Sequence, residues 1–182
     1  MYPKHVTVFG GSQPKPGEPA YDEALRLGHL LGAAGCTVLT GGYMGTMEAV
    51  SRGAVEAGGH VIGVTCAAIE RWRDVGPNPW VQEEWRCQDL PERVKRLIDG
   101  CDAALALPGG PGTLAEVALT WNLLLTDGIP PKPLILIGPG WRTIFETFVQ
   151  TFDAYIPASQ RRWLGFADDV ETAVKRIENK KK

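Results

Sequence analysis

The sequence predicts an α/β fold, a single domain in which helices flank a Rossmann-like, doubly wound parallel sheet. Two observations predict it: short apolar runs alternate with longer helical patterns, and glycine-rich turns directly follow several of those runs. The chain has 182 residues, 44% hydrophobic and 22% charged, which suits one globular domain of ordinary size.

The expected strands are short apolar runs, each bounded by glycine, proline or a polar residue, as in strands buried on both faces. They lie at residues 6–9, 37–40, 60–65, 103–107 and 133–137. Helical patterns separate them at 21–34, 46–57, 91–99, 113–126 and 141–151, and a last strand and capped helix are expected at 162–166 and 168–178. Strand and helix in alternation predict parallel strands joined by right-handed crossovers.

Two helix ends carry clear signals. Asp89 and Glu92 have the spacing of a capping box, with Pro91 in the first turn of the helix. Gly58 follows the helix expected at 46–57, where a left-handed residue is favoured.

Residues 67–86 do not fit the alternating pattern. They contain three tryptophans (Trp72, Trp80 and Trp85) and a Gly-Pro-Asn-Pro stretch, without a helical or strand period. A loop this long is usually a lid or binding loop. The alternative, which we weigh equally, is that its tryptophans only fill a groove or a subunit contact. The tryptophans favour a homodimer. Residues 179–182 are expected to be a frayed tail.

Composition argues against several function classes. The formal net charge is −2, whereas a non-specific nucleic-acid binder normally has a basic excess. The four cysteines form no Cys-x-x-Cys pair and only three histidines accompany them, so no metal site is expected. No cofactor is expected either. The first apolar run is too short for a signal-peptide core, and no later run approaches the ~18 residues of a membrane span. A cytoplasmic location is expected.

Glycine clusters follow three of the expected strands. Since parallel strands end at one edge of a sheet, these turns should meet there, and helix N-termini after them should present N–H groups to an anion. We predict a phosphate site formed by Gly11, Ser12, Gly41, Gly42, Gly45, Thr46, Gly109, Gly110, Gly112 and Thr113. The stretch 110–115 matches G-x-G-x-x-A, but no acidic residue follows the next strand to hold an adenosine ribose, and no Walker A lysine motif is present.

The segment 107–116, Leu-Pro-Gly-Gly-Pro-Gly-Thr-Leu-Ala-Glu, resembles the P-G-G-x-G-T-x-x-E motif of the LONELY GUY family. Stretches 6–12, 41–50 and 58–64 extend the resemblance. Members are cytokinin riboside 5′-monophosphate phosphoribohydrolases, often labelled possible lysine decarboxylases. The resemblance implies a Rossmann-like fold, a homodimer or larger assembly, and hydrolysis of a nucleoside 5′-monophosphate to free base and ribose 5-phosphate.

By register with the family motifs, the resemblance implies that Arg93 and Glu116 are the catalytic residues. A carboxylate at Glu116 can stabilise the oxocarbenium-like sugar of the transition state, and the Arg93 guanidinium can clamp phosphate or position Glu116. We expect Arg96 near the face of Arg93, with Leu90, Val94 and Leu97 as the buried stripe of that helix. Asp102 and Asp127 are candidates for a general acid by position only.

An alternative function is that of a carrier. The fold also resembles that of molybdenum-cofactor carrier proteins, which hold a phosphorylated pterin without cleaving it. Arg93 and Glu116 favour the hydrolase, whereas Val94, Tyr43 and Glu48, where the family usually has lysine and glycines, mildly favour the carrier.

Overall fold

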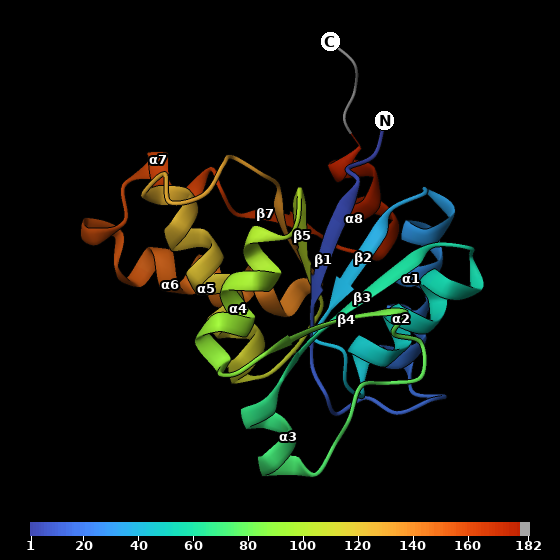
Figure 1. The fold of residues 1–182 in the computed structure, drawn as a ribbon. Helices are drawn as coiled ribbons and strands as arrows, with labels where there is room; N and C mark the ends of the chain where they lie inside the picture. The colour runs from blue at the N-terminus through green and yellow to red at the C-terminus, as the bar shows by residue number, and fades with distance from the viewer. Residues whose placement is uncertain (179–182) are drawn as a thin grey trace.

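Within residues 1–178, which the computed structural model describes, seven parallel strands form one sheet in the order β4-β3-β2-β1-β5-β6-β7 (Figure 1). The strands are β1 His5–Phe9, β2 Thr37–Thr40, β3 His60–Cys66, β4 Glu83–Cys87, β5 Ala103–Ala106, β6 Leu134–Ile137 and β7 Gly165–Ala167. The chain builds outward from β1 to β4 and then returns to place β5 beside β1. The strand order therefore reverses between β1 and β5, as the predicted Rossmann-like class requires.

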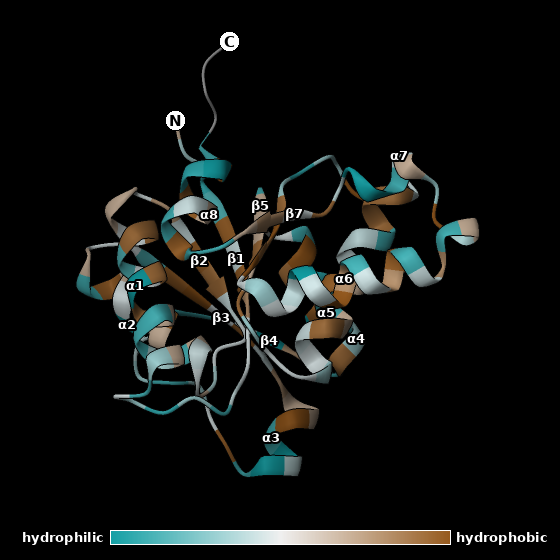
Figure 2. Ribbon diagram, turned by 180° about the vertical axis from the view of Figure 1, so that it is seen from behind, coloured by the Kyte–Doolittle hydropathy of each residue, from teal (hydrophilic) through white to brown (hydrophobic). Residues whose placement is uncertain are grey.

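Helices cover both faces of the sheet. On one face lie α1 (Pro19–Ala33), α2 (Thr46–Glu56) and α8 (Val170–Ile177), and on the other α4 (Leu90–Asp99), α5 (Pro111–Leu125) and α6 (Pro139–Thr151). Each helix layer packs on the strands and buries a separate hydrophobic cluster. Figure 2 shows that the strands are largely hydrophobic. A 3-10 turn (Asp153–Tyr155) and the short α7 (Ala158–Arg161) lead into β7.

The two predicted helix ends are confirmed. The Asp89 carboxylate accepts a hydrogen bond from the Glu92 N–H at 2.9 Å, while the Glu92 carboxylate accepts one from the Gln88 N–H at 2.8 Å. Gly58 has φ +79°, and the following Gly59 N–H returns to the Ala54 carbonyl at 2.8 Å.

The predicted loop at 67–86 is wrong in its secondary structure. It contains the helix α3 (Ala67–Arg73) and most of the edge strand β4. The β4 sequence, Glu-Glu-Trp-Arg-Cys, is charged because an edge strand is only partly covered. Helix α3 has no buried residue and projects from the carboxyl edge of the sheet, which removes the periodic signal that sequence patterns depend on (Figure 1). The last strand also begins later than predicted, at Gly165.

Helices α1 and α2 pack so closely that glycine is required between them. A Cβ atom at Gly28 would lie 2.2 Å from the Val50 carbonyl oxygen, and one at Gly53 would lie 2.0 Å from the Leu25 carbonyl oxygen. The contacting atoms belong to the backbone and cannot rotate away. The approach of the two helices therefore depends on these missing side chains.

We predict that Gly28→Ala lowers the free energy of unfolding by roughly 1–3 kcal/mol, because the new methyl group separates the helices. Chemical denaturation measures this. The matched control is Gly140→Ala in α6, where no heavy atom lies within 4 Å of the added Cβ. It should leave stability unchanged or raise it by up to about 1 kcal/mol, since alanine is the better helix former. Equal losses in both variants would contradict the steric explanation.

Candidate functional site

The glycine turns after β1, β2 and β5 lie against one another at the carboxyl edge of the sheet. The Gly11 N–H donates to the Pro108 carbonyl at 3.3 Å, joining the turns that flank the switch point. The Thr46 N–H and hydroxyl donate to the Gly11 carbonyl at 2.9 and 3.0 Å, which adds the turn after β2. The structure thus brings the three predicted glycine clusters together.

Several of these glycines are required by close contacts. Gly45 has φ +75°, and a Cβ there would lie 2.5 Å from the Ser12 carbonyl carbon. A Cβ at Gly109 would lie 2.2 Å from the buried Thr113 hydroxyl oxygen. Gly110 and Gly112 face open space instead, so their lack of a side chain leaves the turn accessible.

Helix α5 begins at this accessible turn. Its N-cap is Gly110, and in the part of the chain that the structure describes no side chain caps its first N–H groups. Gly110 and Gly112 are exposed, so those N–H groups can reach a ligand. An uncapped helix N-terminus after a glycine turn is chemically suited to a phosphate.

Arg93 of α4 is buried beside these turns. Its Nε donates to the Val64 carbonyl at 2.8 Å and its Nη2 to the Gly41 carbonyl at 3.1 Å. A Cβ at Gly41 would lie 1.9 Å from Nη2, so Gly41 provides the room that the guanidinium occupies. Gly42 in turn donates to the Thr40 hydroxyl at 3.1 Å. In the structure both glycines contact protein groups, and their binding of phosphate stays a prediction.

Glu116 of α5 lies against Arg93. The Glu116 Oε1 atom is 3.5 Å from Arg93 Nη1, and both side chains are nearly inaccessible to solvent. Burial raises the pKa of Glu116 to about 7, although the positive charge of Arg93 opposes the rise. The carboxyl group therefore exchanges its proton near neutral pH.

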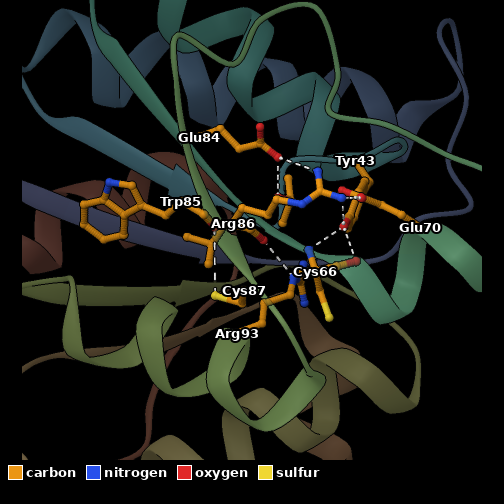
Figure 3. A network of polar contacts seen from close by, with 10 residues as sticks. Tyr43, Cys66, Glu70, Glu84, Trp85, Arg86, Cys87 and Arg93 are labelled. Atoms are coloured by element: carbon orange, nitrogen blue, oxygen red, sulfur yellow. Dashed lines mark hydrogen bonds and ion pairs between the residues drawn. The ribbon is translucent and has the colours of Figure 1, made fainter.

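A polar network lies beside Arg93 (Figure 3). The Tyr43 ring lies 5.7 Å from the Arg93 guanidinium, and its hydroxyl accepts from the Cys66 N–H at 2.6 Å. Asn78 fixes the same turn, donating from Nδ2 to the Tyr43 carbonyl at 2.9 Å. Sequence reasoning missed Tyr43 and Asn78 as supports of the site. The only available signals were the tyrosine at an unusual family position and the Gly-Pro-Asn-Pro stretch.

Other predicted positions lie elsewhere. Arg96 is exposed over the Trp85 ring at 5.2 Å, and Leu90 is 49% exposed, so the predicted buried stripe is wrong at Leu90. Asp102 accepts from the N–H of His5 at the start of β1, the edge opposite Glu116, at 2.9 Å. Asp127 occupies a left-handed turn position with φ +53°. Neither aspartate accompanies Glu116.

Residues 1–178 contain no group of three or more His, Cys, Asp or Glu side chains that could hold a metal ion. All four cysteines are free and buried. None of the helices described is long and apolar enough to cross a membrane.

The family described as "Possible lysine decarboxylase" matches residues 47–177. The chain belongs to this family, the LONELY GUY family. A protein of Oryza sativa subsp. japonica named as a probable cytokinin riboside 5′-monophosphate phosphoribohydrolase is 33% identical, over 96% of this chain and 78% of its own. One from Arabidopsis thaliana, named with the same activity, is 32% identical over 96% and 77%. The solved molybdenum cofactor binding protein of Rippkaea orientalis has a TM-score of 0.75 at 26% identity, covering 97% and 96% of the two chains.

We predict that Glu116 makes the free energy of unfolding depend on pH. Its folded-state pKa of about 7 lies above the ordinary value of 4.5. Between these values the folded chain keeps a proton that the unfolded chain has released, so stability falls as pH rises through this window. The loss relative to Glu116→Gln should be on the order of 1–3 kcal/mol. Denaturant titrations at pH 4.5, 6 and 7.5 measure it, and parallel curves for the two proteins would refute it.

Proposed function

We propose that this LONELY GUY protein hydrolyses the N-glycosidic bond of a nucleoside 5′-monophosphate of the cytokinin riboside or AMP type, releasing free base and ribose 5-phosphate. The buried pair of Arg93 and Glu116 beside an open glycine turn carries the proposal. Relatives that are 32–33% identical are named as cytokinin riboside 5′-monophosphate phosphoribohydrolases, which supports this reaction class.

The phosphate belongs at the start of α5 in this proposal. Gly109, Gly110 and Gly112 leave the first-turn N–H groups accessible, and the helix dipole favours an anion there. Ser12 and Thr46 lie at the same edge of the sheet. The Thr46 hydroxyl donates to the Gly11 carbonyl, and Ser12 packs against Gly45. A phosphate at the helix start leaves the attached ribose within the first turns of α5, on which Glu116 lies.

Glu116 supplies the charge that the reaction needs. As the base departs, positive charge grows on the ribose, and a carboxylate in a water-poor site stabilises it and orients the attacking water. Arg93 acts through Glu116, because its guanidinium is already bound to the Val64 and Gly41 carbonyls. Of the two roles expected for Arg93, these contacts support positioning the carboxylate over clamping phosphate.

A carrier function is the second candidate. The solved molybdenum cofactor binding protein of Rippkaea orientalis shares the fold, and a carrier would use the same phosphate turn. Arg93 and Glu116, which match the family's catalytic residues by register and lie 3.5 Å apart, favour the hydrolase.

The described residues do not support the lysine decarboxylase reaction that the family description suggests. Pyridoxal phosphate chemistry needs a free amine for a Schiff base, and between Lys15 and Lys175 the sequence offers only Lys95 and Lys132. The amine of Lys132 is buried and donates to the Ile98 carbonyl at 2.8 Å. Lys95 is exposed and paired with Asp99, away from the site.

We further propose a cytoplasmic homodimer. Of the three tryptophans that favoured it, only Trp72 is well exposed, at 75%. Further exposed apolar side chains lie on α5, on α6 and at the C-cap of α6: Leu119, Ile144, Phe148 and Phe152 are 38–52% exposed. Apolar side chains clustered on adjacent helices are typical of a subunit interface, and a second copy of this chain is the occupant we propose.

We predict that Glu116→Gln and Arg93→Ala each lower the rate of base release at least ~100-fold, because each removes or misplaces the stabilising carboxylate. Purified protein is incubated with AMP, isopentenyl-AMP and other nucleoside monophosphates, and free base is followed by chromatography. Arg96→Ala, on the exposed face of α4, is the matched control and should retain the wild-type rate. Tight binding without release of any base would leave the carrier function instead.

We predict that Ile144→Asp converts the dimer to a monomer, because a buried carboxylate at the interface has no partner. Analytical ultracentrifugation gives the mass. Trp72→Ala, at the other exposed aromatic position, should remain dimeric. Dissociation by Trp72→Ala but not by Ile144→Asp would place the interface at α3.

A further inference from the structure

Helix α3 contacts the glycine turns through two side chains: Glu70 accepts from the Tyr43 hydroxyl at 3.4 Å, and Arg73 reaches the turn after β1. Arg73 Nη1 donates to the Ser12 hydroxyl at 3.0 Å, and Ser12 follows Gly11 in the turn after β1. A Cβ at Gly11 would lie 3.4 Å from the Gly109 Cα, so this turn is in contact with the one that starts α5. Arg73 therefore stands at the junction where the phosphate is proposed to bind.

Within the described residues, the positive charge of Arg73 is not paired with a carboxylate. Arg93 faces Glu116, and Arg86 faces Glu70 and Glu84. Among residues 1–178, by contrast, no carboxylate oxygen lies within 4.0 Å of the Arg73 guanidinium. Its contacts there are the Ser12 hydroxyl and the ring of Trp72, 4.6 Å away.

The glycine turns themselves, residues 10–12, 41–46 and 108–113, contain hydrogen-bond donors but no basic side chain. Backbone N–H groups and hydroxyls contribute only partial charges to a bound phosphate dianion, and the Arg93 guanidinium is occupied. An arginine with five N–H donors, of which Ser12 takes one, has the geometry for bidentate binding of a phosphate. Stacking on Trp72 limits the orientations of the guanidinium plane.

We propose that Arg73 is a specificity-determining residue that binds the 5′-phosphate together with Ser12 and selects nucleotides over unphosphorylated nucleosides. This inference rests on the proposed function, since it concerns the phosphate of the same substrate. Arg73 approaches from α3, on the side of Ser12, while the start of α5 supplies N–H groups from Gly110 onward. The phosphate thus lies between a helix N-terminus and a cation.

The test compares Arg73→Ala and Arg73→Lys with the matched control Arg71→Ala, an exposed arginine of the same helix. Calorimetry measures binding of ribose 5-phosphate, the proposed product, and KM and kcat are measured with the best nucleotide substrate. Arg73→Ala should weaken ribose 5-phosphate binding and raise KM about 10- to 100-fold, the worth of a charge-assisted hydrogen bond. Its kcat should stay within about threefold, because Arg73 does not contact Glu116. Arg73→Lys should lose part of the affinity, and Arg71→Ala should bind like wild type.

The outcomes separate this inference from the proposed reaction. Unchanged affinity and KM in Arg73→Ala, or an equal loss in Arg71→Ala, would overturn the role of Arg73 while base release stands. Wild-type protein that releases no base, yet binds ribose 5-phosphate in an Arg73-dependent way, would overturn the hydrolase and retain Arg73. Wild-type protein that shows neither binding nor base release would overturn both.

Discussion

The buried guanidinium of Arg93 is the constraint on which the geometry of the site depends. A charge out of contact with water destabilises the fold by several kcal/mol unless it is paired and hydrogen-bonded. The chain meets this requirement with the ends of two strands, the Val64 carbonyl of β3 and the Gly41 carbonyl after β2, and with Glu116 of α5. The absence of a side chain at Gly41 follows from the same requirement, because the guanidinium occupies that space.

The arrangement also explains why Glu116 titrates near neutrality. An arginine at 3.5 Å would ordinarily hold the pKa of a carboxyl group below its usual value. Here the loss of hydration on burial raises the pKa of Glu116 by more than the positive charge of Arg93 lowers it. The site therefore combines a fixed position for the carboxyl group with an ionisation that solution pH can change.

Sequence patterns revealed the strands that are buried on both faces, because such strands are mostly apolar. They did not reveal β4, whose charged residues suit an edge, or α3, which buries no side chain. The glycine turns could be placed on one edge from strand direction alone. The pairing of Arg93 with Glu116 joins residues 23 positions apart and came only from family resemblance. Leu90 was misassigned because the helical period cannot show that the first residue of α4 remains exposed.

The segment between Cys66 and Asn78, which contains α3, is hydrogen-bonded at both ends to the turn after β2. At one end the Tyr43 hydroxyl holds the N–H of Cys66, and at the other Asn78 donates to the carbonyls of Gly42 and Tyr43. A segment closed on itself in this way keeps its middle at a high effective concentration near its contact point. If the bond between Arg73 and Ser12 breaks, its re-formation is therefore an intramolecular step within a segment held at both ends.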